Sequence, residues 1–429
     1  MTDKLNQYFN TTEETDFLLY DCNDNVSMRL YKDVEADNFD KFRNILLEKG
    51  FSEYDNRRTE NCVFSSLLKN KELVQLVYSY PQKELRIIDD EYTAIPNIIK
   101  PEPCGLCPVR LWQFEVDHSL IDCGMCYIIQ CSDYSFFIVD SAHPYSVNDD
   151  IRIYEFLRSK TPSHLPVRVA GWFFSHGHDD HIGKFMDVFR YNKDIIIEGL
   201  YYNFVSNDHF SSDSWMESTK SFARTFIKEV NERDIPIYKL HSGQRFYIRD
   251  LEIDVLCTHE DVFPASLENY NDSSTVLMVR IGEDKICFPG DAGGEESAIL
   301  EARYPNELKC DIMQVAHHGH FGTSALFYQM ANARVALFAT TQIKYDEEYP
   351  RYEANRVADA LADHLFIASN GTVEFTFPLK GSKIKKYPDE TFENFNGIYN
   401  LWSYDYTQQF KDNLQQLFEN NQKTEYFDY

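Results

Sequence analysis

The sequence predicts an α/β fold in which two sheets pack between helices, preceded by a small α+β domain. Between residues 108 and 378, strand-like and helix-like segments alternate, and the strands outnumber the helices. Several strands come in hairpin-like pairs before the next helix, which favours an αββα sandwich over a single parallel sheet. The chain has 429 residues, a length that suits two domains better than one.

Residues 1–98 are expected to form the small α+β domain. Apolar residues from Phe39 to Leu47 follow the spacing of a helix face, and Gly50 provides a stop signal. Short alternating segments at 61–67, 73–80 and 84–89 predict antiparallel strands that pack against this helix. Because this part of the chain has no catalytic motif, we expect it to mediate protein contacts or oligomerisation.

A stretch with four prolines, residues 95–108, is the predicted domain boundary. A large α/β domain is predicted over 108–378. A C-terminal extension with an amphipathic helix at 404–418 is predicted over 379–429. Strands of the large domain are expected at 125–131, 135–140, 167–175, 195–200, 245–257, 275–281, 285–289, 311–316, 334–339 and 371–377. Its helices are expected at 148–159, 180–190, 214–231, 294–302, 324–332 and 353–363.

The composition limits the class of partner. The formal charge is −27, from 69 acidic and 42 basic residues, and this charge repels nucleic-acid phosphates at long range. The first residues lack the basic start and apolar run of a signal peptide, and no apolar run approaches the roughly 18 residues of a membrane span. We therefore expect a cytoplasmic protein with no membrane partner, with its ten cysteines reduced.

The motif that carries the most chemistry is His-Gly-His-Asp-Asp-His, residues 176–181, which follows an apolar strand and precedes a helix. In an extended segment, His176 and His178 point to the same face and can bind one ion. Asp180 and His181, where the chain turns into the helix, can reach a second ion. The alternative is a solvated loop that is rich in His and Asp, but this pattern at the end of a strand favours a metal site.

This motif has the H-x-H-x-D-H form of the metallo-β-lactamase superfamily, which the chain resembles over roughly residues 110–378. Asp140 ends a strand in Phe-Phe-Ile-Val-Asp, Asp291 follows Gly290 after a strand, and His317-His318 ends a later strand. The resemblance implies a metallo-β-lactamase αββα sandwich with a dinuclear centre. It also implies that Asp291 bridges both ions and that Asp140 orients a ligand imidazole rather than binding metal.

Two parts of the ligand set stay open in the sequence. The position twenty residues before Asp291, where many family members have a metal-binding His, holds Asn271, whose amide oxygen is a weaker zinc ligand than imidazole. His259 is the alternative if the preceding loop folds back. His317 and His318 are adjacent and would point to opposite sides of a regular strand, so the sequence does not decide which of them binds metal.

The expected chemistry is hydrolysis by a dinuclear centre that holds two divalent ions, with Zn²⁺ favoured and Mn²⁺ as the alternative. Two ions roughly 3.5–4 Å apart lower the pKa of a shared water from about 15.7 towards about 7 and supply a metal-bound hydroxide. Asp180 is placed to orient this hydroxide, and His318 or His320 to protonate a leaving alkoxide.

Asn271–Ser274, Gly290-Asp291 and His317–Gly319 together are similar to the branch that includes ComEC and pneumococcal phosphorylcholine esterase. That resemblance implies a phosphodiesterase with a small-molecule phosphoester substrate. The alternatives are a nuclease of the competence type, which the charge disfavours, and a metal-binding interaction protein without catalysis. Aromatic residues such as Phe210 and Phe321 could enclose a compact group, although ordinary packing is the better explanation for either of them alone.

The cysteine spacing offers a second candidate site. Cys104 and Cys107 form one pair with two residues between them, Cys123 and Cys126 form another, and fifteen residues separate the pairs. That spacing is within the range of a four-cysteine structural zinc site. The second pair falls in a predicted core strand, where small buried cysteines are common, so packed thiols are the alternative.

Overall fold

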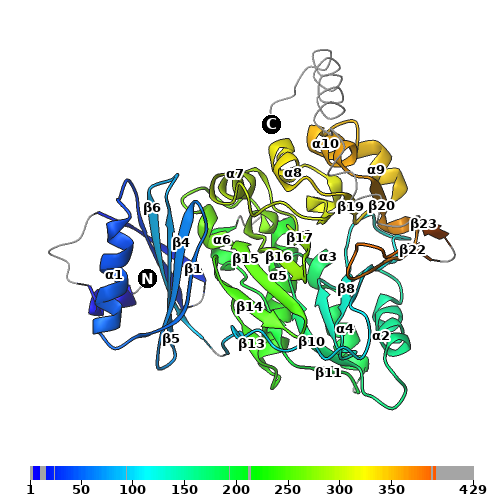
Figure 1. Ribbon diagram of the computed structural model, residues 1–429, viewed down its shortest axis with the longest axis horizontal. Coiled ribbons are helices and arrows are strands. Elements are labelled where there is room, and N and C mark those ends of the chain that lie inside the picture. Colours follow the sequence, from blue (N-terminus) through cyan, green and yellow to red (C-terminus); the bar gives the residue numbers. More distant parts are fainter. Residues whose placement is uncertain are drawn as a thin grey trace.

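The computed structural model describes residues 3–9, 16–23, 25–92, 94–192, 194–210, 214–387 and 390–392. Figure 1 shows a smaller N-terminal part, with one helix outside a sheet, beside a larger part in which two sheets lie between helices. This arrangement confirms the predicted fold class. No helix in the described part of the chain is long and apolar enough to cross a membrane.

The N-terminal domain is a six-stranded antiparallel sheet with a helix on its outer face. After a short 3-10 helix, η1 (Lys4–Gln7), its strands in spatial order are β1 (Leu18–Asn23), β2 (Val26–Tyr31), β6 (Glu84–Glu91), β5 (Glu72–Ser79), β4 (Cys62–Lys69) and β3 (Ser52–Arg58). Helix α1 (Asp37–Glu48) packs Phe39, Phe42 and Leu46 against the outer face. The inner face places Phe64 and Val77 in the core of the larger domain, so both faces of the sheet are covered.

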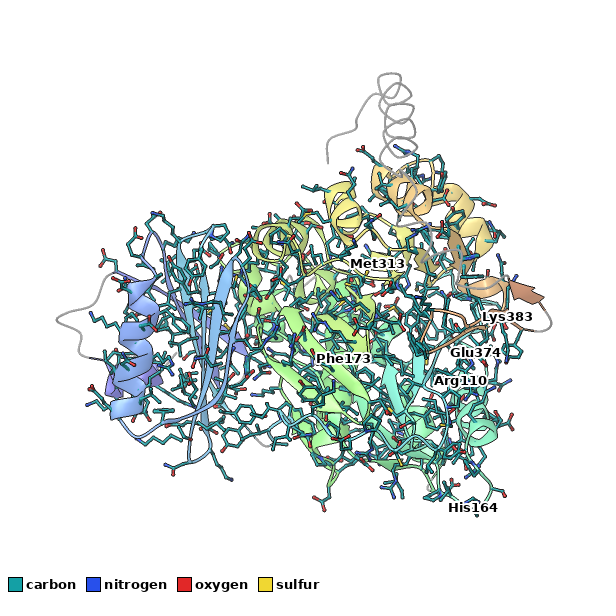
Figure 2. All side chains as sticks on the ribbon, in the orientation of Figure 1. Arg110, His164, Phe173, Met313, Glu374 and Lys383 are labelled. Carbon is teal, nitrogen blue, oxygen red and sulfur yellow. The ribbon has the colours of Figure 1, made fainter. Side chains whose placement is uncertain are left out.

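The first sheet of the large domain is mixed. Its order is β13 (Ile237–Tyr238), β12 (Leu200–Tyr201), β10 (Arg168–Phe173), β9 (Phe136–Val139), β8 (Tyr127–Gln130), β7 (Arg110–Gln113), β21 (Val373–Thr376), β22 (Ile384–Lys386) and β23 (Glu390–Phe392), with β11 (Ile196–Ile197) paired to β10. Strands β9, β10 and β12 run parallel. Phe173, which ends β10, lies near the centre of the molecule in Figure 2.

The second sheet has seven strands and packs face to face on the first. Its order is β14 (Arg245–Ile248), β15 (Leu251–Cys257), β16 (Val276–Ile281), β17 (Asp284–Phe288), β18 (Ile312–Gln314), β19 (Val335–Phe338) and β20 (His364–Ile367). Residues of both sheets, such as Phe137 and Ile253, share one apolar cluster. The sheets approach closely at Gly171, where an added Cβ would lie 2.8 Å from Ile248 Cδ1.

Helices cover the outer faces of this sandwich. Those on the first sheet are α2 (Asp149–Lys160), α4 (Phe185–Tyr191) and α5 (Ser214–Asn231), and those on the second are α7 (Gly294–Arg303), α8 (Ala325–Ala331) and α10 (Glu353–Leu361). The remaining short helices are α3 (Asp179–Ile182), α6 (His259–Val262), α9 (Gln342–Glu348), η2 (Asn207–His209), η3 (Tyr270–Ser273), η4 (Ala316–Gly319) and η5 (Ala368–Asn370).

The large domain extends beyond its predicted end at residue 378. Strand β22 pairs with β21, and β23 pairs with β22, so the sheet continues to residue 392. The run of lysines around β22 favours a solvated segment, but Ile384 is fully buried between them and the Lys385 ammonium lies 3.5 Å from a carboxylate oxygen of Glu374. The predicted helix at 404–418 lies outside the described residues.

A buried polar network fixes the N-terminal domain to the large domain. Arg86 donates hydrogen bonds to the carbonyl oxygens of Glu260 and Phe263, at 3.1 and 2.7 Å. The imidazole of His241 lies between two carboxylates, with Nδ1 2.9 Å from Glu260 Oε1 and Nε2 3.2 Å from Asp90 Oδ2. All three side chains of this triad are almost completely buried, so the two domains form one packed unit.

The triad predicts how stability depends on pH. Burial lowers the pKa of His241, but Glu260 and Asp90 outweigh burial and raise the pKa to about 10. Since the unfolded pKa is about 6.5, the charged imidazole stabilises the fold fully below that pH, and this contribution is lost as the pH rises through about 10. We expect His241→Gln to lower the unfolding midpoint more at pH 6 than at pH 10.

The control is His164→Gln, because His164 is exposed at the margin of the molecule (Figure 2) and should shift the midpoint little at either pH. Thermal unfolding of the three proteins gives the comparison. A loss for His241→Gln that is constant with pH, or that grows towards pH 10, would contradict the assignment of a charged His241.

Candidate metal centre

The chemistry-bearing residues gather where parallel strands of both sheets end. Asp140 follows β9, and the 176–181 motif follows β10, its neighbour in the first sheet. Asp291 follows β17 and His318 follows β18, which are parallel neighbours in the second sheet. Because parallel strands present their carboxyl ends at the same edge, segments distant in sequence meet at one place between the sheets.

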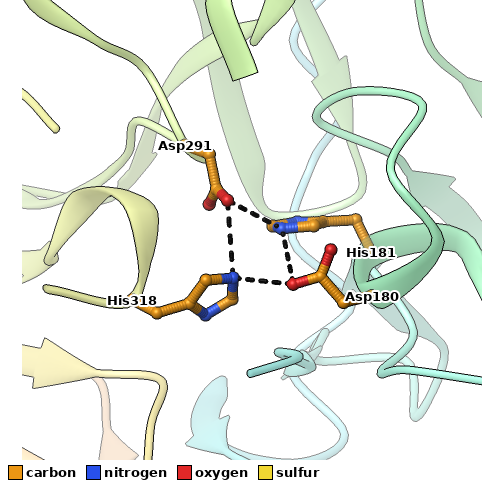
Figure 3. A group of neighbouring side chains, drawn as sticks. All are labelled: Asp180, His181, Asp291 and His318. Atoms are coloured by element: carbon orange, nitrogen blue, oxygen red, sulfur yellow. Dashed lines mark ion pairs between the residues drawn. The ribbon is translucent and has the colours of Figure 1, made fainter. Parts of the chain in front are cut away.

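One group of possible metal ligands consists of Asp180, His181, Asp291 and His318, shown in Figure 3. His318 Nε2 lies 2.9 Å from Asp180 Oδ2 and 3.4 Å from Asp291 Oδ2. His181 Nε2 lies 3.2 Å from Asp291 Oδ2 and 3.5 Å from Asp180 Oδ2. Two imidazole nitrogens and two carboxylates therefore converge on one point, and each of the four residues is buried.

A second group consists of His176, His178 and Asp291. His176 Nε2 lies 3.2 Å from His178 Nδ1 and 4.0 Å from Asp291 Oδ2. Asp291 belongs to both groups, so its carboxylate joins two neighbouring sets of nitrogen and oxygen donors. The sequence assigned His176 with His178 to one ion and Asp180 with His181 to the other, and the structure divides these four residues in the same way.

Contacts of the Nδ1 atoms orient three of the ligand imidazoles. His181 Nδ1 lies 2.9 Å from Asp140 Oδ2, and His318 Nδ1 donates to the carbonyl oxygen of Ala339 at 2.8 Å. His176 Nδ1 lies 3.0 Å from the hydroxyl of Ser175, which donates to the same Asp140 carboxylate. Each contact leaves Nε2 turned towards the ligand group, as in metal sites whose ligands are held by outer hydrogen bonds.

Sequence reasoning missed two of these supports. Ser175 stands directly before the motif, so its position was a usable signal, because a hydroxyl there can reach backwards to Asp140. The Ala339 carbonyl had no signal, since any residue presents the same backbone oxygen.

The donor set fits metal ions. Asp291 Oδ1 and Asn271 Oδ1 are buried and have no hydrogen-bond partner among the described residues. A buried carboxylate oxygen without a partner costs free energy, and a bound cation offsets that cost. Imidazole nitrogens with carboxylate oxygens form a donor set suited to a borderline ion such as Zn²⁺.

The charges around the centre support the same interpretation. Burial alone would raise the pKa of Asp291 and of Asp180, but the neighbouring imidazoles of His181 and His318 hold both pKa values well below the usual range. Burial and the nearby His181 lower the pKa of His176 well below its ordinary value. The carboxylates are therefore ionised and His176 is neutral, which are the forms that bind a cation. The same carboxylates outweigh burial and raise the pKa of His181 and of His318, so without metal both imidazoles carry a proton that a bound cation would replace.

The structure separates the two adjacent histidines. They are not on a strand, because β18 ends at Gln314 and both residues adopt left-handed backbone angles, with φ of 50° for His317 and 56° for His318. His318 points into the ligand group, whereas His317 Nε2 accepts a hydrogen bond from Asn271 Nδ2 at 3.0 Å. The expectation of a regular strand is therefore wrong, but only one of the two histidines binds in a ligand group, as expected: His318 belongs to one, and His317 belongs to neither.

Of the two candidates for the missing histidine ligand, the structure places Asn271 at the centre and His259 away from it. Asn271 lines the same cleft as Asp180 and Asp291. His259 is fully buried in α6, and its ring lies 6.3 Å from that of Phe263. It belongs to neither ligand group, so the alternative based on His259 is wrong.

The cysteine pairs do not meet. Cys126 packs in the core between the first sheet and its helices, whereas Cys123 lines the metal cleft. Among the described residues, the groups that could hold a metal contain no cysteine. Cys104, Cys107, Cys123 and Cys126 are therefore separate thiols rather than a zinc site.

The centre opens into a cleft of about 570 Å³. His143, Asn271, His317 and His320 contribute to its walls, and Phe321 lies at its rim. Phe210, the other aromatic candidate, is not among the residues that line the cleft, and its ring packs 4.2 Å from that of Tyr270. His320 also lines the cleft, and its Nδ1 lies 3.6 Å from Glu348 Oε1, beyond hydrogen-bond distance.

Comparison with known proteins agrees with this architecture. Residues 124–334 match the model of the metallo-beta-lactamase superfamily, so the chain contains a domain of that superfamily. No curated protein matches the chain.

Three solved structures that match part of this chain have low sequence identity to it and low TM-scores. The metallo-beta-lactamase fold protein YhfI from Bacillus subtilis is 12% identical over 67% of this chain and 100% of its own, with a TM-score of 0.39. CmlA, a diiron β-hydroxylase from Streptomyces venezuelae, is 12% identical over 65% of this chain and 54% of its own, with a TM-score of 0.38. The short form of human tRNase Z is 10% identical over 55% of this chain and 94% of its own, with a TM-score of 0.30.

The shared carboxylate predicts a distinctive pattern of metal loss. After reconstitution with Zn²⁺ or Mn²⁺, we expect elemental analysis to find two ions per chain. Asp180→Asn and His178→Ala should each weaken the binding of one ion, because each residue belongs to one ligand group only. Asp291→Asn should weaken both, because a neutral amide replaces the carboxylate common to the two groups.

The matched control is Asp234→Asn, which changes an exposed carboxylate and should keep the full metal content. Circular dichroism of each variant establishes that the fold is retained. Loss of only one ion in Asp291→Asn, or full metal content in all three site variants, would contradict the assignment.

Proposed function

We propose that this protein is a metal-dependent hydrolase that cleaves phosphodiester bonds in a small substrate with two divalent ions. The observation that carries the proposal is the position of Asp291 in both ligand groups, which supports two neighbouring ions rather than one. When bound, such a pair activates a water and polarises the oxygens of a phosphoryl group. A phosphodiester has two non-bridging oxygens, so it is suited to binding two adjacent cations.

The side chains of the cleft supply the remaining steps. Asp180 lies beside His318 at the edge of the ligand group and is placed to orient the attacking water. His318 has its Nε2 committed to that group, so His320 is the remaining candidate to protonate a leaving alkoxide, although burial lowers the pKa of its imidazole to about 4. Glu348 lies near the His320 ring, and Asn271, whose amide donates to His317, also lines the cleft.

The charge of the cleft favours a small substrate over a polynucleotide. The described residues that line it include Asp122 and Asp179 but no lysine or arginine. A strand of nucleic acid would bring further phosphates to this acidic wall, where no cation could neutralise them. The volume of about 570 Å³ lies within the range of sites for small molecules, roughly 300–1,000 Å³.

The test compares bis-(p-nitrophenyl) phosphate with single-stranded DNA and RNA at low salt, using metal-loaded protein. We expect turnover of the small diester and little degradation of the polymers. His320→Gln should reduce kcat by about 10²–10⁴-fold on a diester with an alkyl leaving group. Its effect should be much smaller with a p-nitrophenyl leaving group, because p-nitrophenolate departs without a proton.

His164→Gln is the matched control, since it removes an exposed imidazole that does not line the cleft and should not change either rate. Thioester and β-lactam substrates complete the panel. Rapid degradation of DNA or RNA without turnover of the small diester would replace the proposal with a nuclease, and hydrolysis confined to lactams or thioesters would exclude phosphodiesters.

A further inference from the structure

Exposed apolar side chains gather around the mouth of the metal cleft. Four of them are strongly exposed: Leu120 at 71%, Tyr145 at 67%, Phe321 at 63% and Ile343 at 73%. They come from four separate segments of the chain, and all four line the cleft or the hollow next to it. Single exposed apolar residues are ordinary on protein surfaces, but a gathering at one site is typical of a binding surface.

The cleft continues into two further hollows, which together we call the side groove. The first, of about 440 Å³, shares Ile121 and Asp122 with the metal cleft and has Leu120 and Ile343 in its walls. The second, of about 660 Å³, shares His118 with the first hollow. The side groove is therefore adjacent to the metal cleft at Ile121 and Asp122, where one ligand could occupy both.

The side groove has no spare positive charge among the described residues that line it. Lys344 Nζ lies 3.1 Å from Glu348 Oε1, so its charge is already paired. Arg152, in the second hollow, is paired with the fully buried Asp149 at 2.5 Å. Because both cations are engaged and the carboxylates of Asp117, Asp122 and Glu347 also line the side groove, it does not favour a second phosphate or another anionic group.

From these observations we infer that the side groove binds an apolar arm of the substrate, so that the substrate is an amphiphilic phosphodiester. The phosphoryl group lies at the metal centre, and an alkyl, acyl or aryl arm lies between Leu120 and Ile343. Phe321 and Tyr145, at the rim of the cleft, cover the part of the arm that is closest to the phosphoryl group. This inference rests on the proposed phosphodiesterase function and assigns the class of its substrate.

The experiment uses the metal-loaded full chain and a series of alkyl p-nitrophenyl phosphates with methyl, butyl, hexyl and octyl arms. We expect kcat/KM to rise by about two- to fourfold for each methylene that enters the side groove. The double variant Leu120→Ser/Ile343→Ser should flatten this dependence on chain length. Ile99→Ser is the matched control, because Ile99 is 74% exposed and belongs to the linker between the domains.

The outcomes distinguish the two levels of the proposal. One result is that the diesters are cleaved with a kcat/KM that does not depend on chain length, and another is that the double variant keeps the wild-type dependence of kcat/KM on chain length. Either result excludes binding of an apolar arm in the side groove and leaves the proposed phosphodiesterase activity intact. If no diester is cleaved, the proposed function fails. Calorimetric titration with alkylphosphonates of the same chain lengths then tests whether the side groove binds an apolar arm. Affinity that rises with chain length supports this binding, and equal affinities contradict it.

The source of the amphiphile is tested in the same series. Activity on the octyl ester below the concentration at which it forms micelles indicates a free small ester. An increase in kcat/KM that occurs only in micelles, or in mixed vesicles of the octyl ester with phosphatidylcholine, also supports an amphiphilic substrate and assigns it to a lipid surface. Equal rates for the methyl and octyl esters in both states would overturn the inference.

Discussion

The Asp291 carboxylate is 2% exposed and lies between imidazoles that come from both halves of the sandwich. Collecting two carboxylates and four imidazoles in one buried place is unfavourable unless cations balance the carboxylates and bind the nitrogens. The local backbone is built to allow this approach. Gly290 has a φ of 61°, and a Cβ there would lie 2.9 Å from Ser175 Cβ, so only glycine lets this turn pack against the motif of the first sheet.

The N-terminal domain is connected to this arrangement through Tyr270, whose ring lies beside that of His178. The carbonyl oxygen of Cys22, in β1, accepts a hydrogen bond from the amide of Ser206 at 3.2 Å. The next residue, Asn207, contacts the Tyr270 hydroxyl, and the Tyr270 ring lies 5.6 Å from the ring of His178. A continuous set of contacts therefore runs from β1 to a candidate metal ligand, which gives the packed N-terminal domain a structural role in positioning the site.

Periodicity and the spacing of the motifs were enough to predict the central strands and most of the large helices, because their apolar faces alternate regularly. Strand β3, Ser-Glu-Tyr-Asp-Asn-Arg-Arg, could not be predicted in that way, since it is a charged edge strand that is stabilised by its pairing with β4. Strand β20 is short and only half-buried at His364 and Leu365. In each case tertiary pairing, rather than local propensity, determines the strand.

The candidate site also has parts that the sequence predicts and parts that depend on the folded structure. The 176–181 motif, Asp140 and Asp291 are visible in the sequence because each stands at the end of an apolar strand. The choice of His318 over His317 is not, because it depends on two left-handed residues that turn the ring of His318 towards Asp180. The side groove is not visible either, since Leu120 and Ile343 are separated by more than half of the chain and meet only in the folded protein.

The claim on which the whole account depends is that Asp291 joins two metal ions, and anomalous X-ray scattering from crystals of the Zn²⁺-loaded protein tests it most directly. If Asp291 joins two ions, two anomalous peaks are expected on either side of its carboxylate, roughly 3.5–4 Å apart. One peak should be bordered by His176 and His178, and the other by Asp180, His181 and His318. A single peak, or peaks located away from Asp291, would contradict it.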